Sequence, residues 1–138
     1  MRLRASDHAE ALAVARRLQR SRPASAADDR RALLLFWYGS GATRLRAEDD
    51  VLLGAWRRHG GEDHPLSAAI RGEAARLHRE IAAIAADASP SAGRLRRAGE
   101  ALGAHVLRQE RELRGVVERT VPAGELAEVD SALRLVHP

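Results

Sequence analysis

The chain has 138 residues, which is enough for one domain with a buried core and too few for two. Hydrophobic residues make up 45% of the chain but aromatic residues only 3%, so the core must consist of Leu, Ala, Val and Ile, which suits packed helices. The net charge is +4, yet all 23 basic residues are arginines interleaved with 19 acidic residues. This pattern is typical of solvated helix surfaces, and we expect no nucleic-acid partner.

The sequence also argues against membranes and disulfides. It contains no apolar run of 18 residues and no basic, apolar and small-residue leader, so neither a membrane span nor a secretion signal is expected. Cysteine is absent, which excludes disulfides and thiolate metal sites. A cytoplasmic location is the default expectation.

The first two predicted helices cover residues 7–21 and 26–59. Asp7 and Glu10 have the spacing of a helix N-cap and its return partner, and Gly60 and Gly61 close the second helix. Gly39 and Gly41 lie in the middle of this second helix, where each costs about 1 kcal/mol relative to alanine. The pattern leaves two explanations open, a kink or a bulky neighbour that needs the room.

Two further long helices and a short one complete the chain. Pro65 begins a helix over residues 66–88, and Ser91 precedes a helix over residues 94–117 that ends near Pro122. Spaced apolar residues in the tail predict a short C-terminal helix. The fold class is therefore all-α, with residues 1–138 forming a single up-down-up-down antiparallel four-helix bundle plus that short helix.

Each of the four long helices places at least one polar side chain on its predicted inner face. These residues are His8, Arg44, Glu48, His78, His105 and Glu110. Buried carboxylates without partners lose several kcal/mol of hydration, so the group must satisfy itself or hold an ion. Imidazole and carboxylate together are ligands for iron, zinc or manganese, and bundle cores accommodate such sites. His59, His64 and His137, by contrast, lie in a loop or at the chain end and are expected to be exposed.

Four stretches resemble the hemerythrin-like, or HHE cation-binding, domain family across nearly the whole chain. They are DHAEALAVARRL at 7–18, FWYGSGATRLRAEDDVLL at 36–53, HGGEDHPLSAAIRGEAARLHREI at 59–81 and AHVLRQEREL at 104–113. The resemblance implies a four-helix bundle with a non-heme di-iron centre held by five histidines and two bridging carboxylates. Five of these seven positions keep a ligand residue, namely His8, Glu48, His78, His105 and Glu110.

Arg44 and Ala74 stand at the two remaining positions, where the family has histidine. The guanidinium of Arg44 is permanently charged and can pair with Glu48 or Glu110, so we expect it to replace the metal nearest His8. A single iron or zinc ion at His78, His105 and one or both carboxylates is the remaining metal site that the resemblance implies.

The resemblance thus implies a degenerate site that binds at most one metal, with iron as the first expectation. The protein would sense or handle oxygen, nitric oxide, peroxide or iron, and is not expected to be an enzyme. The alternative is a metal-free bundle that serves as an interaction, regulatory or small-molecule-binding protein. A protein partner or self-association is left open, and no catalytic triad or phosphate-binding glycine loop is present.

Overall fold

The computed structural model describes residues 2–4 and 7–136, and this part of the chain contains helices and no strands. The predicted all-α class is confirmed for these residues, whereas His137 lies outside them. The helices are α1 (Ala9–Gln19), α2 (Ala26–Phe36), α3 (Ala42–Trp56), α4 (Pro65–Ala86), α5 (Ala92–Arg108), α6 (Arg114–Thr120) and α7 (Ala123–Val136). Wider π-helical segments are η1 (Trp37–Gly41) and η3 (Gln109–Leu113), whereas η2 (Arg57–Gly61) is a bend after α3 in which His59 and Gly60 leave helical geometry. Because η1 joins α2 to α3 and η3 joins α5 to α6, two of the helical rods are long and continuous.

Local sequence signals set most of the helix ends. Pro65 occupies the first turn of α4, and the Ser91 hydroxyl accepts the backbone N–H of Arg94 at 3.1 Å at the start of α5. The predicted cap of the first helix is displaced: α1 begins at Ala9, and the Asp7 carboxylate accepts the N–H of Ala9 at 3.0 Å. The predicted third, fourth and C-terminal helices agree with the structure to within a few residues.

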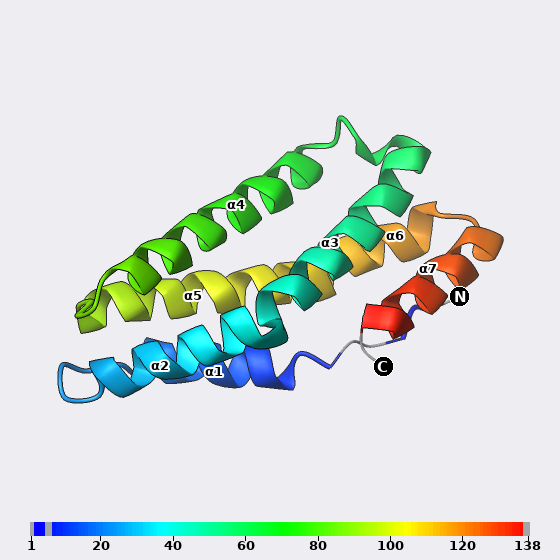
Figure 1. Cartoon of the computed structure of the whole chain (residues 1–138). Helices are drawn as coiled ribbons and strands as arrows, with labels where there is room; N and C mark the ends of the chain where they lie inside the picture. Colours follow the sequence, from blue (N-terminus) through cyan, green and yellow to red (C-terminus); the bar gives the residue numbers. More distant parts are fainter. Residues whose placement is uncertain (1, 5–6, 137–138) are drawn as a thin grey trace.

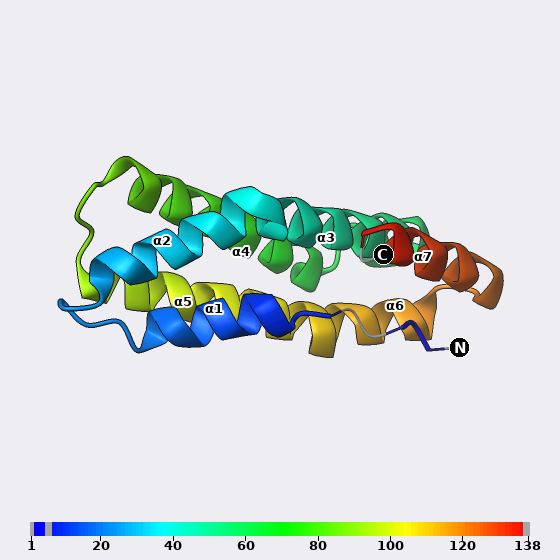
Figure 2. The same ribbon diagram turned by 60° about the horizontal axis from the view of Figure 1, so that its bottom comes forward.

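The rods pack along their lengths, as Figures 1 and 2 show. Helix α5 lies between α1 and α4, α2 contacts α1, α4 and α5, and α3 contacts α6 and α7. Two groups of buried apolar residues form the core, one containing Leu18, Leu33, Ile81 and Leu102 and the other containing Leu52, Ile70, Leu113 and Leu126. None of the described helices is both long and apolar enough to span a bilayer.

The π-helical segment η1 explains Gly41, one of the two glycines in the middle of the second predicted helix. A Cβ atom on Gly41 would lie 2.5 Å from Cζ of Phe36, so a bulky neighbour does need the room there, whereas Gly39 has no such neighbour. A π turn also holds an extra residue, and each residue rotates the helix face by about 100°. The buried face therefore passes from Leu33 and Trp37 to Leu45 and not to Arg44.

Gly99 allows α5 to approach α1 closely. A Cβ atom at this position would lie 2.7 Å from both the carbonyl oxygen of Ala15 and Cβ of Leu18. Backbone atoms cannot move aside as a flexible side chain can, so the two helices would have to separate.

We predict that Gly99→Ala lowers the free energy of unfolding by about 1–3 kcal/mol, because it overpacks the α1–α5 contact. The matched control is Gly72→Ala in α4, which has open space around its Cβ position and should be neutral or stabilising by up to about 1 kcal/mol. Denaturant unfolding followed by circular dichroism measures both. Equal stability of the two variants would contradict the close approach.

Candidate functional site

Two consecutive carboxylates on α3, Glu48 and Asp49, are the centre of the polar interior. Their exposed fractions are 0% and 6%, and they lie between Leu45 and Leu52 on the buried face of the helix. Because consecutive helical residues point about 100° apart, the two carboxylates reach different neighbours. Glu48 meets His8 at the start of α1 and Arg114 of α6, whereas Asp49 meets His105 of α5 and Gln109 of η3.

The first cluster is formed by His8, Glu48 and Glu110. The Nε2 atom of His8 lies 2.8 Å from Oε2 of Glu48, and its Nδ1 atom is hydrogen-bonded to Oε1 of Glu110. Burial by itself would lower the pKa of His8, but its hydrogen bonds to Glu48 and Glu110 outweigh burial and raise this pKa. A protonated imidazole donates from both ring nitrogens, so His8 bridges the two carboxylates as a cation.

Arg114 is the second cation beside this cluster. It is buried, and its Nη2 atom lies 3.9 Å from Oε2 of Glu48, while its Nη1 atom donates to the backbone oxygen of Arg4. Burial lowers the pKa of Arg114, and Glu48 and Glu110 oppose this shift. Arginine stays charged in proteins, so Arg114 supplies positive charge beside Glu48. A bound metal ion would otherwise supply that charge.

The second cluster repeats the arrangement around His105. Its Nε2 atom lies 2.7 Å from Oδ2 of Asp49, and its Nδ1 atom faces Oε1 of Glu73 at 3.5 Å. Gln109 donates to Oδ1 of Asp49 at 3.0 Å, and Nε of Arg108 lies 2.7 Å from Oε2 of Glu73. Burial would lower the pKa of His105, but Asp49 and Glu73 raise it. His105 is thus a second imidazole between two carboxylates.

His78 belongs to neither cluster. Its ring packs edge-on against Trp37 with 4.9 Å between centroids, and burial lowers its pKa, so it is neutral near pH 7. With His105 and Asp49 it lines a cavity of about 290 Å³ to which α3, α4 and α5 contribute.

The predicted ligand residues are therefore divided between separate places. His8, Glu48 and Glu110 come together, His105 pairs with Asp49 and Glu73, and His78 lies apart. Within residues 2–4 and 7–136, no three His, Asp or Glu side chains converge on a point that a metal ion could occupy. A di-iron centre does not fit this donor arrangement, because the carboxylates expected to bridge the metals are held on opposite edges of one imidazole ring.

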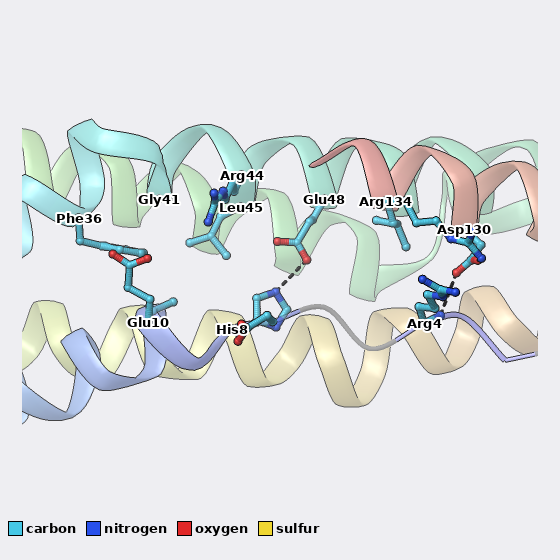
Figure 3. A pocket seen from close by; sticks show the side chains of 13 residues that line it. Arg4, His8, Glu10, Phe36, Gly41, Arg44, Leu45, Glu48, Asp130 and Arg134 are labelled. Atoms are coloured by element: carbon cyan, nitrogen blue, oxygen red, sulfur yellow. Dashed lines mark hydrogen bonds and ion pairs between the residues drawn. The ribbon is translucent and has the colours of Figure 1, made fainter. Parts of the chain in front are cut away.

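The predicted ion pair of Arg44 with Glu48 or Glu110 is wrong for the described residues. Arg44 is exposed and lines a cavity of about 300 Å³ beside Glu48, as Figure 3 shows, and Arg114 is the arginine that approaches Glu48. The reason is the extra residue in η1, which turns Arg44 away from the buried face of α3.

Several residues that complete the clusters were not singled out from the sequence. They are Asp49, Glu73, Arg108, Gln109 and Arg114. One usable signal was the spacing of four residues from His105 to Gln109 and on to Leu113, which places the three side chains on one helix face. His64 is exposed as predicted, but His59 is half-buried, with its Nε2 atom 2.5 Å from Oε2 of Glu125.

Comparison with models of protein families, with curated proteins and with solved structures finds no match to this chain. The hemerythrin-like resemblance therefore rests on the motifs and residues of the sequence alone.

We predict that Arg114→Ala destabilises the protein by about 3 kcal/mol, because it removes a buried cation beside buried Glu48. Arg44→Ala should change stability by about 0.5 kcal/mol or less, since the side chain is exposed. Urea unfolding at neutral pH compares the two variants. A large loss in Arg44→Ala with little loss in Arg114→Ala would reverse the assignment of the two arginines.

The raised pKa of His8 predicts a loss of stability at alkaline pH. Its ordinary pKa is 6.5, so protonated His8 contributes stability that is fully present below that pH and is lost as the pH rises through its higher folded-state pKa. We expect His8→Gln to flatten the dependence of the unfolding free energy on pH between about 6 and 9. His105 titrates in the same direction, so part of the slope remains. If the unfolding free energy of His8→Gln depended on pH as steeply as that of the parent protein, His8 would not be a protonated bridge between Glu48 and Glu110.

Proposed function

We propose that this chain is a hemerythrin-like, up-down-up-down four-helix bundle whose interior uses protonated histidines in place of metal ions. The four rods are α1, α2–α3, α4 and α5–α6, with α7 as the additional short helix. We further propose that the protein is not an enzyme and that it binds a small polar molecule in the cavity beside His8.

The observation that carries the metal-free proposal is the use of both ring nitrogens of His8. A metal ion needs a nitrogen lone pair, so metal binding at His8 requires the loss of one of its two carboxylate bonds together with a proton. Arg114 adds a positive charge near Glu48, and two cations repel each other most strongly where water is excluded. The carboxylates that would attract a metal thus already have cationic partners supplied by the chain.

The cavity of about 300 Å³ supports the proposed binding function. It is lined by residues of the segment before α1 and of α1, α2, η1, α3 and α7, and both His8 and Glu48 contribute to its wall. This volume is near the lower end of the range of about 300–1,000 Å³ for ligand pockets, which favours a small molecule. The His8–Glu48 hydrogen bond holds α1 against α3 at the cavity and fixes the shape of that wall.

A second candidate function is the binding of one metal ion in the cavity that His78 lines. Neutral His78 has a free lone pair, and His105 and Asp49 line the same cavity, which together make two imidazoles and a carboxylate. His105 would first have to give up its hydrogen bond to Asp49. A bound iron ion would supply redox chemistry or gas binding there.

Metal loading separates the two candidates. We expect protein purified without a histidine tag and then loaded anaerobically with Fe(II) to contain far less than one iron per chain by plasma mass spectrometry, with an unchanged melting temperature. The second candidate instead requires about one iron per chain, lost in both His78→Ala and His105→Ala and kept in the exposed control His64→Ala. That result would overturn the metal-free proposal.

A further inference from the structure

The cavity beside His8 is lined by charged side chains of both signs over an apolar floor. Its charged residues are Arg4, Arg44, Arg134, His8, Asp7, Glu10, Glu48 and Asp130. Three arginines and His8 face four carboxylates there, so the lining carries both signs of charge in similar number. A ligand that carries equal positive and negative charge fits such a lining better than a multiply charged anion does.

Most of these charges already have partners within the protein. Glu48 is bonded to His8, and Asp130 accepts from Nη2 of Arg134 at 2.9 Å and from the backbone N–H of Arg4 at 2.9 Å. Asp7 accepts the N–H of Ala9 at the start of α1. The backbone hydrogen bond from Arg4 lowers the pKa of the Asp130 carboxyl, and the charge of Arg4 lies near enough to lower it further. Arg44 and Glu10 are therefore the better candidates for contact with a ligand.

Arg44 and Glu10 are charges of opposite sign that do not pair with each other. Arg44 comes from α3 and Glu10 from the first turn of α1, and neither side chain makes a hydrogen bond or ion pair to another described residue. Figure 3 shows Arg44 on α3 at one side of the cavity, while Glu10 rises from α1 to the Phe36 ring. A guanidinium and a carboxylate at one cavity can be bridged by a ligand carrying the complementary charges.

The apolar part of the lining lies next to this pair. Ala11, Phe36, Leu45 and Leu133 contribute to it, and the close contact of Gly41 with the Phe36 ring fixes the position of that ring. An aliphatic side chain would be removed from water against these residues, which gains about 0.8 kcal/mol per buried CH₂.

On these grounds we propose that the cavity binds a free amino acid with an aliphatic side chain, its carboxylate on Arg44 and its ammonium group on Glu10. This inference rests on the proposed small-molecule function and adds the chemical class of the ligand. The guanidinium–carboxylate contact would be bidentate, and the ammonium group would donate to Glu10 as a point charge.

The test uses L-leucine and two analogues that each lack one charge. L-leucinamide keeps the ammonium group and loses the carboxylate, whereas N-acetyl-L-leucine keeps the carboxylate and loses the ammonium group. We expect L-leucine to cause saturable shifts of the Ala11, Gly41 and Leu45 amide signals in NMR titrations, and both analogues to bind at least about tenfold more weakly.

Two variants assign each charge to its residue. Arg44→Gln should weaken L-leucine about tenfold and abolish its advantage over leucinamide, while keeping its advantage over N-acetyl-leucine. Glu10→Gln should also weaken L-leucine about tenfold, but it should abolish the advantage over N-acetyl-leucine and keep the advantage over leucinamide. The exposed residues Arg16 and Glu100 lie outside the cavity, so Arg16→Gln and Glu100→Gln are matched controls that should bind as the parent protein does. Circular dichroism verifies that all four variants fold.

Failure of this inference and failure of the proposed function give different results. The amino-acid assignment would be overturned if N-acetyl-leucine or leucinamide bound as tightly as L-leucine. The cavity would then be a site for small molecules that carry only one of the two charges. No shift at the cavity with L-leucine up to about 10 mM would also overturn it. If a library of neutral, anionic, cationic and zwitterionic fragments likewise gave no shift there, the small-molecule function itself would fail.

Discussion

The burial of Glu48 and Asp49 side by side on α3 is the constraint on which the rest of the interior depends. Two adjacent carboxylates taken out of water require positive charge and hydrogen-bond donors close by. Helix α1 supplies His8 to one of them, and α5 supplies His105 to the other. Since these partners come from different rods, the same bonds that neutralise the carboxylates also join α1, α3 and α5.

Each histidine is in turn placed between two carboxylates. His8 lies between Glu48 and Glu110, and His105 lies between Asp49 and Glu73. An imidazole in that position is stabilised in its protonated form. That form has no free nitrogen lone pair with which to bind a metal ion. His8 is also held by two directed hydrogen bonds and His105 by its hydrogen bond to Asp49, so each specifies the rotation of neighbouring helices in a way that an apolar contact does not.

The π-helical segments decide which residues take part. Segment η1 turns Arg44 out of the core and brings Leu45 in, and η3 keeps Gln109 and Leu113 on the face that His105 begins. Without the extra residue in each wide turn, the buried face would drift around the helix. The outward rotation of Arg44 leaves this guanidinium at the cavity beside His8, where it is the proposed partner of the ligand's carboxylate.

The sequence by itself determined the helices and most of the polar positions inside them. Capping residues, prolines and apolar spacing are local signals, so they predicted the approximate bounds of α4 and α5–α6, the presence of α7 and the burial of His8, Glu48 and His105. Only the tertiary structure decided the pairing of these groups, namely that Asp49 would meet His105 and that Arg114, not Arg44, would approach Glu48. The physical reason is that a partner is set by how helices are rotated against one another, and one additional residue in a turn changes that rotation by about 100°.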